Sequence, residues 1–160
     1  MTRRHPLRAD DLPAALCRQA EGALCAEAAA MILVEQRCWL TRDDFVARFV
    51  ETFPAFADAT PMAVIDWDAA LAAIDTGGLA CSASEGQMLR IAASLATGVP
   101  VDLSNALSGL DDHNLGIVLA AMAHAGRATT RLPAPTLSTA HTSPREASPD
   151  HRNCMLSHTL

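Results

Sequence analysis

The sequence predicts an all-α fold, a compact bundle of four to five helices followed by a disordered C-terminal tail. Ala and Leu, the best helix formers, dominate the apolar residues, whereas aromatic residues make up only 4% of the chain and Tyr is absent. From residue 128 the composition changes to Thr, Ser, Pro, Arg and His without a periodic apolar pattern. We therefore expect a flexible basic arm (1–9), a helical domain (10–127) and a disordered tail rich in Thr, Ser and Pro (128–160).

The first half of the domain predicts two helices. One is expected over residues 11–36, where apolar residues recur at helical spacing and Gly22 is a potential break. The other is expected to begin at Thr41 and Asp44, whose T-x-x-D spacing resembles a capping box, and to end before Pro54. Its apolar face consists of phenylalanines four residues apart: Phe45, Phe49 and Phe53.

The second half has clearer helix boundaries. Asp66 is expected to cap a helix that ends at two consecutive glycines. Overlapping S-x-x-E and S-x-x-Q sequences over residues 82–87 predict the start of the next helix, whose wide apolar face makes it the central one. The short helix that follows is expected to be capped by Asp102. The last helix is expected to be capped by Asp111 or Asp112 and to end near residue 125.

The charge distribution argues against nucleic acid as the main partner. Residues 9–127 contain sixteen acidic residues against six arginines, and an acidic surface repels phosphate groups. Only the N-terminal arm is basic, through Arg3, Arg4 and Arg8. An accessory protein that binds nucleic acid through this arm is therefore an alternative function, and the expected partner is another protein or a second copy of the chain.

The sequence predicts no membrane segment, metal or cofactor. No stretch reaches the roughly 18 uncharged apolar residues of a membrane-spanning helix, and charged residues interrupt any signal-peptide core. A cytoplasmic protein without a membrane partner is expected. The five cysteines form no CxxC or C-x-H pair, and the glycines form no phosphate-binding loop. We interpret the thiols as small buried side chains.

Four stretches carry a resemblance to other proteins. They are WLTRDDFV (39–46), IDWDAA (65–70), CSASE (81–85) and LRIAASLATGVPVDLSNALSGLDDHN (89–114). Together they resemble a group of small uncharacterised helical proteins of actinobacteria, which have no assigned activity. The resemblance covers residues 12–126 and implies an actinobacterial origin, but it implies no function.

Glu27, Asp111 and His113 are the candidate catalytic residues. On a continuous first helix Glu27 falls within the apolar face, and a buried carboxylate is common at functional sites. Asp111 and His113 add a second carboxylate and an imidazole. A small enzyme that uses Glu27 with Asp111 or His113 is thus a second alternative function. The competing interpretations are structural: Gly22 breaks the helix or Glu27 pairs with an arginine, and Asp111 is a helix cap.

The last helix predicts an interaction surface, because residues 115–123 carry no charge. The residues expected to face the core are Leu115, Val118, Leu119 and Met122. The other side would present Ile117, Ala120, Ala121 and His124 to a partner, and homodimers are the commonest way to bury such a patch. The alternative is that neighbouring helices cover both sides. The leading hypothesis is therefore a non-enzymatic helical protein-interaction module, either regulatory or part of an assembly.

Overall fold

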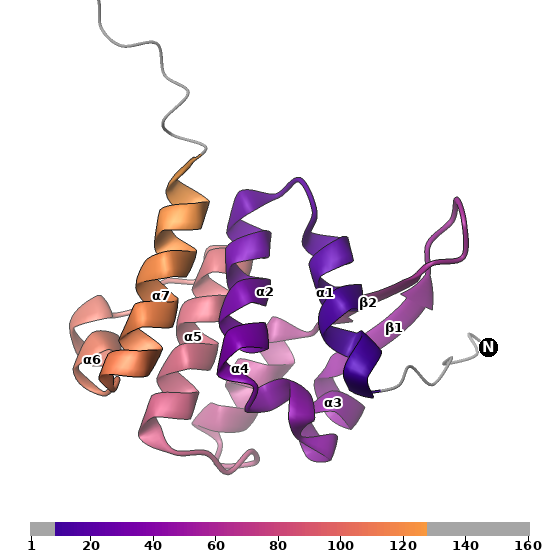
Figure 1. Ribbon diagram of the computed structural model, residues 1–160. Helices are drawn as coiled ribbons and strands as arrows, with labels where there is room; N and C mark the ends of the chain where they lie inside the picture. Colours follow the sequence, from indigo (N-terminus) through magenta and orange to yellow (C-terminus); the bar gives the residue numbers. More distant parts are fainter. Residues whose placement is uncertain (1–8, 128–160) are drawn as a thin grey trace, which may run out of the picture.

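A computed structural model of the chain describes residues 9–127 (Figure 1). Its elements are the 3-10 helix η1 (Ala9–Asp11), α1 (Leu12–Ala20), α2 (Leu24–Gln36), the 3-10 helix η2 (Trp39–Thr41), α3 (Asp43–Phe49), β1 (Val50–Pro54), β2 (Pro61–Ile65), α4 (Trp67–Asp75), α5 (Ala83–Thr97), α6 (Leu103–Ser108) and α7 (Asp112–Ala125). This part of the chain is mostly helical, with seven α-helices rather than four or five, and it also contains a two-stranded sheet. The basic arm and the tail expected over 128–160 lie outside the described residues.

Helix α2 lies at the centre of the fold (Figure 1). It packs against α5 and α7 on one side and against α1 on the other, and α1 in turn covers β2. A helix surrounded in this way is apolar on several sides, which fits the buried residues Ala28, Ala29, Ala30, Ile32 and Leu33 of α2. Helix α5, predicted to be the central one, packs against α2 and also contacts α4, α6 and α7.

The continuous helix predicted over residues 11–36 is wrong, whereas the potential break at Gly22 is confirmed. Gly22 has φ +88°, a left-handed conformation that glycine adopts without the steric cost a side chain would bring. The chain reverses direction there, so α1 and α2 form a helical hairpin (Figure 1). This reversal also sets the orientation of Glu27 in the first turn of α2.

The helix predicted to extend to Phe53 ends at Phe49. Residues 50–54 instead form β1, which pairs antiparallel with β2 from Val50 opposite Ile65 to Pro54 opposite Pro61. The i+4 spacing of the phenylalanines suggested helix, but Val, Thr and Phe also favour strands, and the partner strand supplies backbone hydrogen bonds. The all-α prediction is therefore corrected to a mostly helical fold with a β-hairpin.

The capping box predicted at Thr41 and Asp44 is not formed. The Thr41 hydroxyl donates to the backbone carbonyls of Arg37 (2.8 Å) and Cys38 (2.9 Å), so it serves the end of α2 rather than the start of α3. Asp44 Oδ1 accepts from the backbone N–H of Phe45 at 2.9 Å, within the first turn of α3.

The helix starts predicted in the second half of the domain are confirmed. Ser82 and Glu85 form a complete capping box, with Ser82 Oγ accepting from the Glu85 N–H (3.2 Å) and Glu85 Oε2 accepting from the Ser82 N–H (2.7 Å). Asp66, Asp102 and Asp111 each accept backbone N–H groups at the starts of α4, α6 and α7. Even α5, the longest helix of residues 9–127 at 15 residues, is too short to cross a membrane, and no other helix in this range is long and apolar enough to do so.

Candidate functional site

Exposed apolar side chains gather on the last two helices of the described chain. Between residues 9 and 127, four large apolar side chains are exposed, and three of them belong to α6 and α7: Leu103 (46%), Leu107 (37%) and Leu119 (57%). The fourth is Phe56, at the tip of the β-hairpin. The helices α6 and α7 follow one another through a short connection and lie at the left edge of the molecule in Figure 1. This edge is the best candidate for an interaction surface.

The side of α7 that faces solvent differs from the predicted one. Leu119, expected in the core, is 57% exposed, while Ala121, expected on the surface, is completely buried. Ile117 is half-buried and His124 is mostly covered, so of the four residues predicted for the interface only Ala120 is exposed. We define the outer face of α7 by five of its six exposed residues, all except His113: Asp112, Gly116, Leu119, Ala120 and Ala123.

A groove runs alongside this face, between α2 and α7. Its volume is about 480 Å³. It is lined by Met31 and Glu35 of α2 and by Asp112, His113, Gly116, Ile117 and Ala120 of α7. The middle of the groove is therefore apolar, and its charged and polar groups come from the C-terminal end of α2 and the N-terminal end of α7. Three residues of the outer face, Asp112, Gly116 and Ala120, form part of its wall.

Glu27 joins the α1–α2 reversal to the far end of α7. Its Oε1 accepts from the backbone N–H of Gly22 at 2.8 Å, and its Oε2 lies 2.5 Å from Nε2 of His124. The hydrogen bond with His124, followed by the one from Gly22, lowers the pKa of Glu27. The side chains of Glu27 and His124 are each about one-fifth exposed. The contact is an ion pair when the imidazole is protonated, and its position indicates a structural role.

Glu27 is not brought together with Asp111 and His113. Glu27 contacts His124, which follows His113 by eleven residues on the same helix. At the rise of an α-helix this separates the two histidines by about 16 Å along the axis, too far for both to act on one small substrate. Asp111 is instead the cap of α7, accepting from the backbone N–H of Asn114 at 2.8 Å. His113 is exposed at the groove.

Replacing Glu27 with Gln is expected to reduce stability at neutral pH and to flatten its dependence on acid. Because the pKa of Glu27 is lowered in the folded protein, the unfolded chain binds more protons. The stabilisation by the Glu27 carboxylate is thus present at pH values above the ordinary pKa of a glutamate. It is lost as the pH falls through the lowered pKa that Glu27 has in the folded protein. Urea unfolding followed by circular dichroism, from about pH 7 to about pH 3, measures this change.

The exposed Glu35 on the same helix provides the control. Glu35→Gln removes one charge from α2 without touching Gly22 or His124, so it should retain the wild-type acid dependence. If Glu27→Gln lost stability with acid as steeply as the wild type, the two contacts of Glu27 would not be stabilising.

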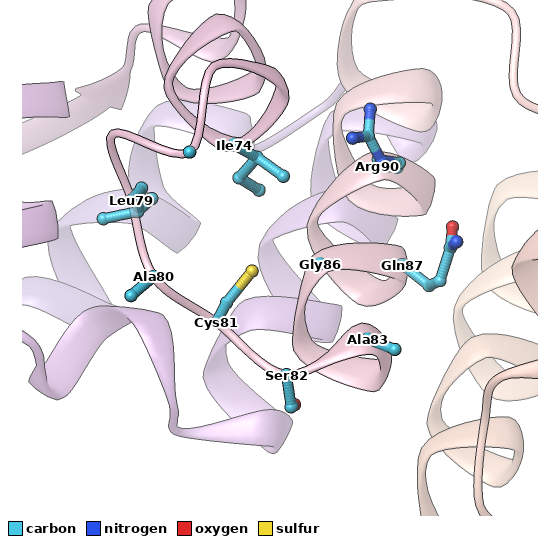
Figure 2. A pocket seen from close by; sticks show the side chains of 10 residues that line it. Ile74, Leu79, Ala80, Cys81, Ser82, Ala83, Gly86, Gln87 and Arg90 are labelled. Carbon is cyan, nitrogen blue, oxygen red and sulfur yellow. The ribbon is translucent and has the colours of Figure 1, made fainter.

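A second pocket, of about 360 Å³, lies between α5 and the segment that precedes it (Figure 2). The Cys81 side chain points into it, between Ile74 and Gly86. A Cβ atom at position 86 would lie only 3.3 Å from Cys81 Sγ, so glycine there leaves room for the thiol. Burial raises the pKa of Cys81, which disfavours the nucleophilic thiolate. Arg90, also in the lining, pairs with Asp75 at 2.5 Å. Cys81 therefore favours the neutral thiol, and the guanidinium of Arg90 is held by Asp75.

The other nucleophilic side chains near this pocket are also engaged. The Cys38 thiol donates to Glu85 Oε1 at 3.0 Å, and burial together with this bond raises the pKa of Cys38 to about 12. The Ser84 hydroxyl accepts from Asn114 Nδ2 at 2.9 Å, which ties the starts of α5 and α7 together.

Cys17 and Cys25, contrary to the prediction of buried thiols, are exposed.

Within residues 9–127 no group of three or more His, Cys, Asp or Glu side chains is arranged to hold a metal ion. The predicted nucleic-acid residues Arg3, Arg4 and Arg8 lie outside the described residues.

No known protein family, curated protein or solved structure matches this chain. The resemblance to a group of actinobacterial proteins therefore stays a prediction.

Proposed function

We propose that this chain is a non-enzymatic helical protein-interaction module, regulatory or part of an assembly, that binds its partner through the outer face of α7. The observation that carries the proposal is Leu119, a large apolar side chain left 57% exposed in the middle of a helix without charged residues from position 115 to 123. Burying a fully exposed leucine side chain contributes about 1.5–3 kcal/mol, and a little over half of Leu119 remains to be covered. The groove beside the helix adds a concave apolar surface that a partner side chain can fill.

The use of the reactive side chains supports the non-enzymatic part of the proposal. The side chains of Ser82 and Glu85 accept backbone N–H groups at the start of α5, and Asp111 does the same at the start of α7. Glu27 holds the α1–α2 reversal against His124. In the described part of the chain these groups act on the backbone or on one another. An acid–base pair, in contrast, must reach a common substrate.

Photo-cross-linking tests the proposed surface. A photoreactive phenylalanine analogue at position 119, in the cells that naturally produce the protein, is expected to give one or a few discrete adducts. The same analogue at Ala47, an exposed alanine of α3, serves as the control and should give none. Adding Ala120→Glu should abolish the adducts from position 119, because a charge would enter the interface. No adduct at position 119, or equal labelling from both positions, would contradict the proposal.

A further inference from the structure

We infer that the partner of the α7 outer face is a second copy of this chain, bound through an antiparallel, two-fold symmetric pair of α7 helices. This inference rests on the proposed function and names the partner of that same surface. It follows from three observations: the symmetric order of the residues on this face, the charges at its two ends, and the exposed leucine at its centre.

The exposed residues are symmetric about the middle of the helix. Gly126 keeps a right-handed helical conformation (φ −70°, ψ −13°), so the helical path continues to the exposed Arg127. At 100° per residue, Arg127 falls in the same sector, about 100° wide, as the outer face. Around the point between positions 119 and 120, the residues form pairs at equal distances: Asp112 with Arg127, Gly116 with Ala123, and Leu119 with Ala120. An antiparallel two-fold pair places the members of each pair at the same level along the two helix axes.

The charges select this arrangement. In an antiparallel pair, Asp112 of each copy lies opposite Arg127 of the other, which gives two attractive contacts per dimer. In a parallel pair, the two Asp112 carboxylates would face each other, as would the two Arg127 guanidinium groups, and the like charges would repel. Within residues 9–127 neither Asp112 nor Arg127 forms an ion pair with another residue. Both are exposed and thus positioned to meet a second copy.

The exposed leucine accounts for the centre of the pair. A two-fold axis places each flank of one α7 helix against the same flank of the other, so the two Leu119 side chains would contact each other. Leu119 lies on the flank of α7 away from the groove, and this contact would remove apolar surface of both copies from water. Because Gly116, Ala120 and Ala123 have small side chains or none, the two helix backbones can approach closely. Each copy contributes the same leucine, as a two-fold interface requires.

Charge reversal tests the pairing. Asp112→Arg and Arg127→Asp, made singly, each turn both attractive contacts into repulsive ones and are expected to weaken self-association on the order of tenfold. The double variant Asp112→Arg/Arg127→Asp restores opposite charges and is expected to associate about as well as the wild type. Both reversals oppose the helix dipole, and the double variant carries both. Its recovery therefore cannot come from a change in helix stability. Sedimentation equilibrium over about 1–100 µM measures the association.

A second variant tests the apolar centre. Leu119→Glu should give a monomer with the wild-type circular dichroism spectrum, whereas Ala47→Glu on α3 should remain a dimer. A wild-type protein that is monomeric at about 100 µM overturns the inference, as does a double charge variant that fails to recover. If position 119 of such a monomer still cross-links to a different protein, the proposed interaction surface stands and only the second copy is ruled out. If it cross-links to nothing, both proposals fall.

Discussion

Replacing Trp39 with Ala is expected to lower the free energy of unfolding by about 3–5 kcal/mol. Trp39 is completely buried, and its ring centroid lies 5.1 Å from that of Phe45. Its indole Nε1 donates to the backbone carbonyl of Glu85 at 3.2 Å. The side chain thus joins the connection between α2 and α3 to the first turn of α5, and its removal leaves a cavity and removes this hydrogen bond.

Trp39→Phe separates these two effects. Phenylalanine keeps an aromatic ring against Phe45 but cannot donate to Glu85, so it should cost less than the alanine change. Urea unfolding followed by far-UV circular dichroism compares the three proteins without relying on tryptophan fluorescence. A loss below about 1 kcal/mol for Trp39→Ala would mean that the neighbouring side chains fill the space, contrary to the packing described above.

Ala121→Glu is expected to prevent α7 from docking and to destabilise the fold by at least about 3 kcal/mol, because an unpaired carboxylate would enter the core. Ala121 is completely buried, whereas Ala120, one residue earlier, is exposed. Ala120→Glu should therefore leave the protein folded. The two variants have the same composition, so thermal unfolding of the pair measures the effect of position alone.

This pair of variants also decides the orientation of α7. Had the side carrying Ala121 been the free one, as the sequence suggested, Ala121→Glu would give a folded monomer. Similar stability of the two variants would show that Ala121 is not packed in the core.

The sequence predicted best those features that depend on neighbouring residues. The capping box of Ser82 and Glu85 requires only residues three positions apart and is formed as expected, whereas the T-x-x-D pattern at Thr41 did not form one. The segment 50–54 could not be assigned in this way, because a strand needs a partner, here residues 61–65, and its helical spacing of phenylalanines was the stronger local signal. The pairing of residues 50–54 with residues 61–65 overrode the local preference for a helix.

The candidate site shows the same limit. Glu27 and His124 were each singled out by the sequence, but their contact spans 97 positions and no local pattern signals it. The rotation of α7 was also undetermined, because a helix that is apolar on all sides has no preferred buried face until its neighbours are known. The packing of α2 against α7 therefore decides which residues reach solvent, and through them which surface is available for a partner.

The central position of α2 has a consequence for how the protein is made. The α1–α2 hairpin leaves the ribosome early, but the helices that cover α2 are α5 and α7, which are synthesised later. Until residue 125 has emerged, buried side chains of α2 such as Ile32 and Leu33 lack part of their native cover. Because contacts between distant parts of a chain form late and slowly, folding of this domain is expected to finish after translation has passed α7. Nascent chains that stop before α7 would then be substrates for chaperones that recognise exposed apolar helices.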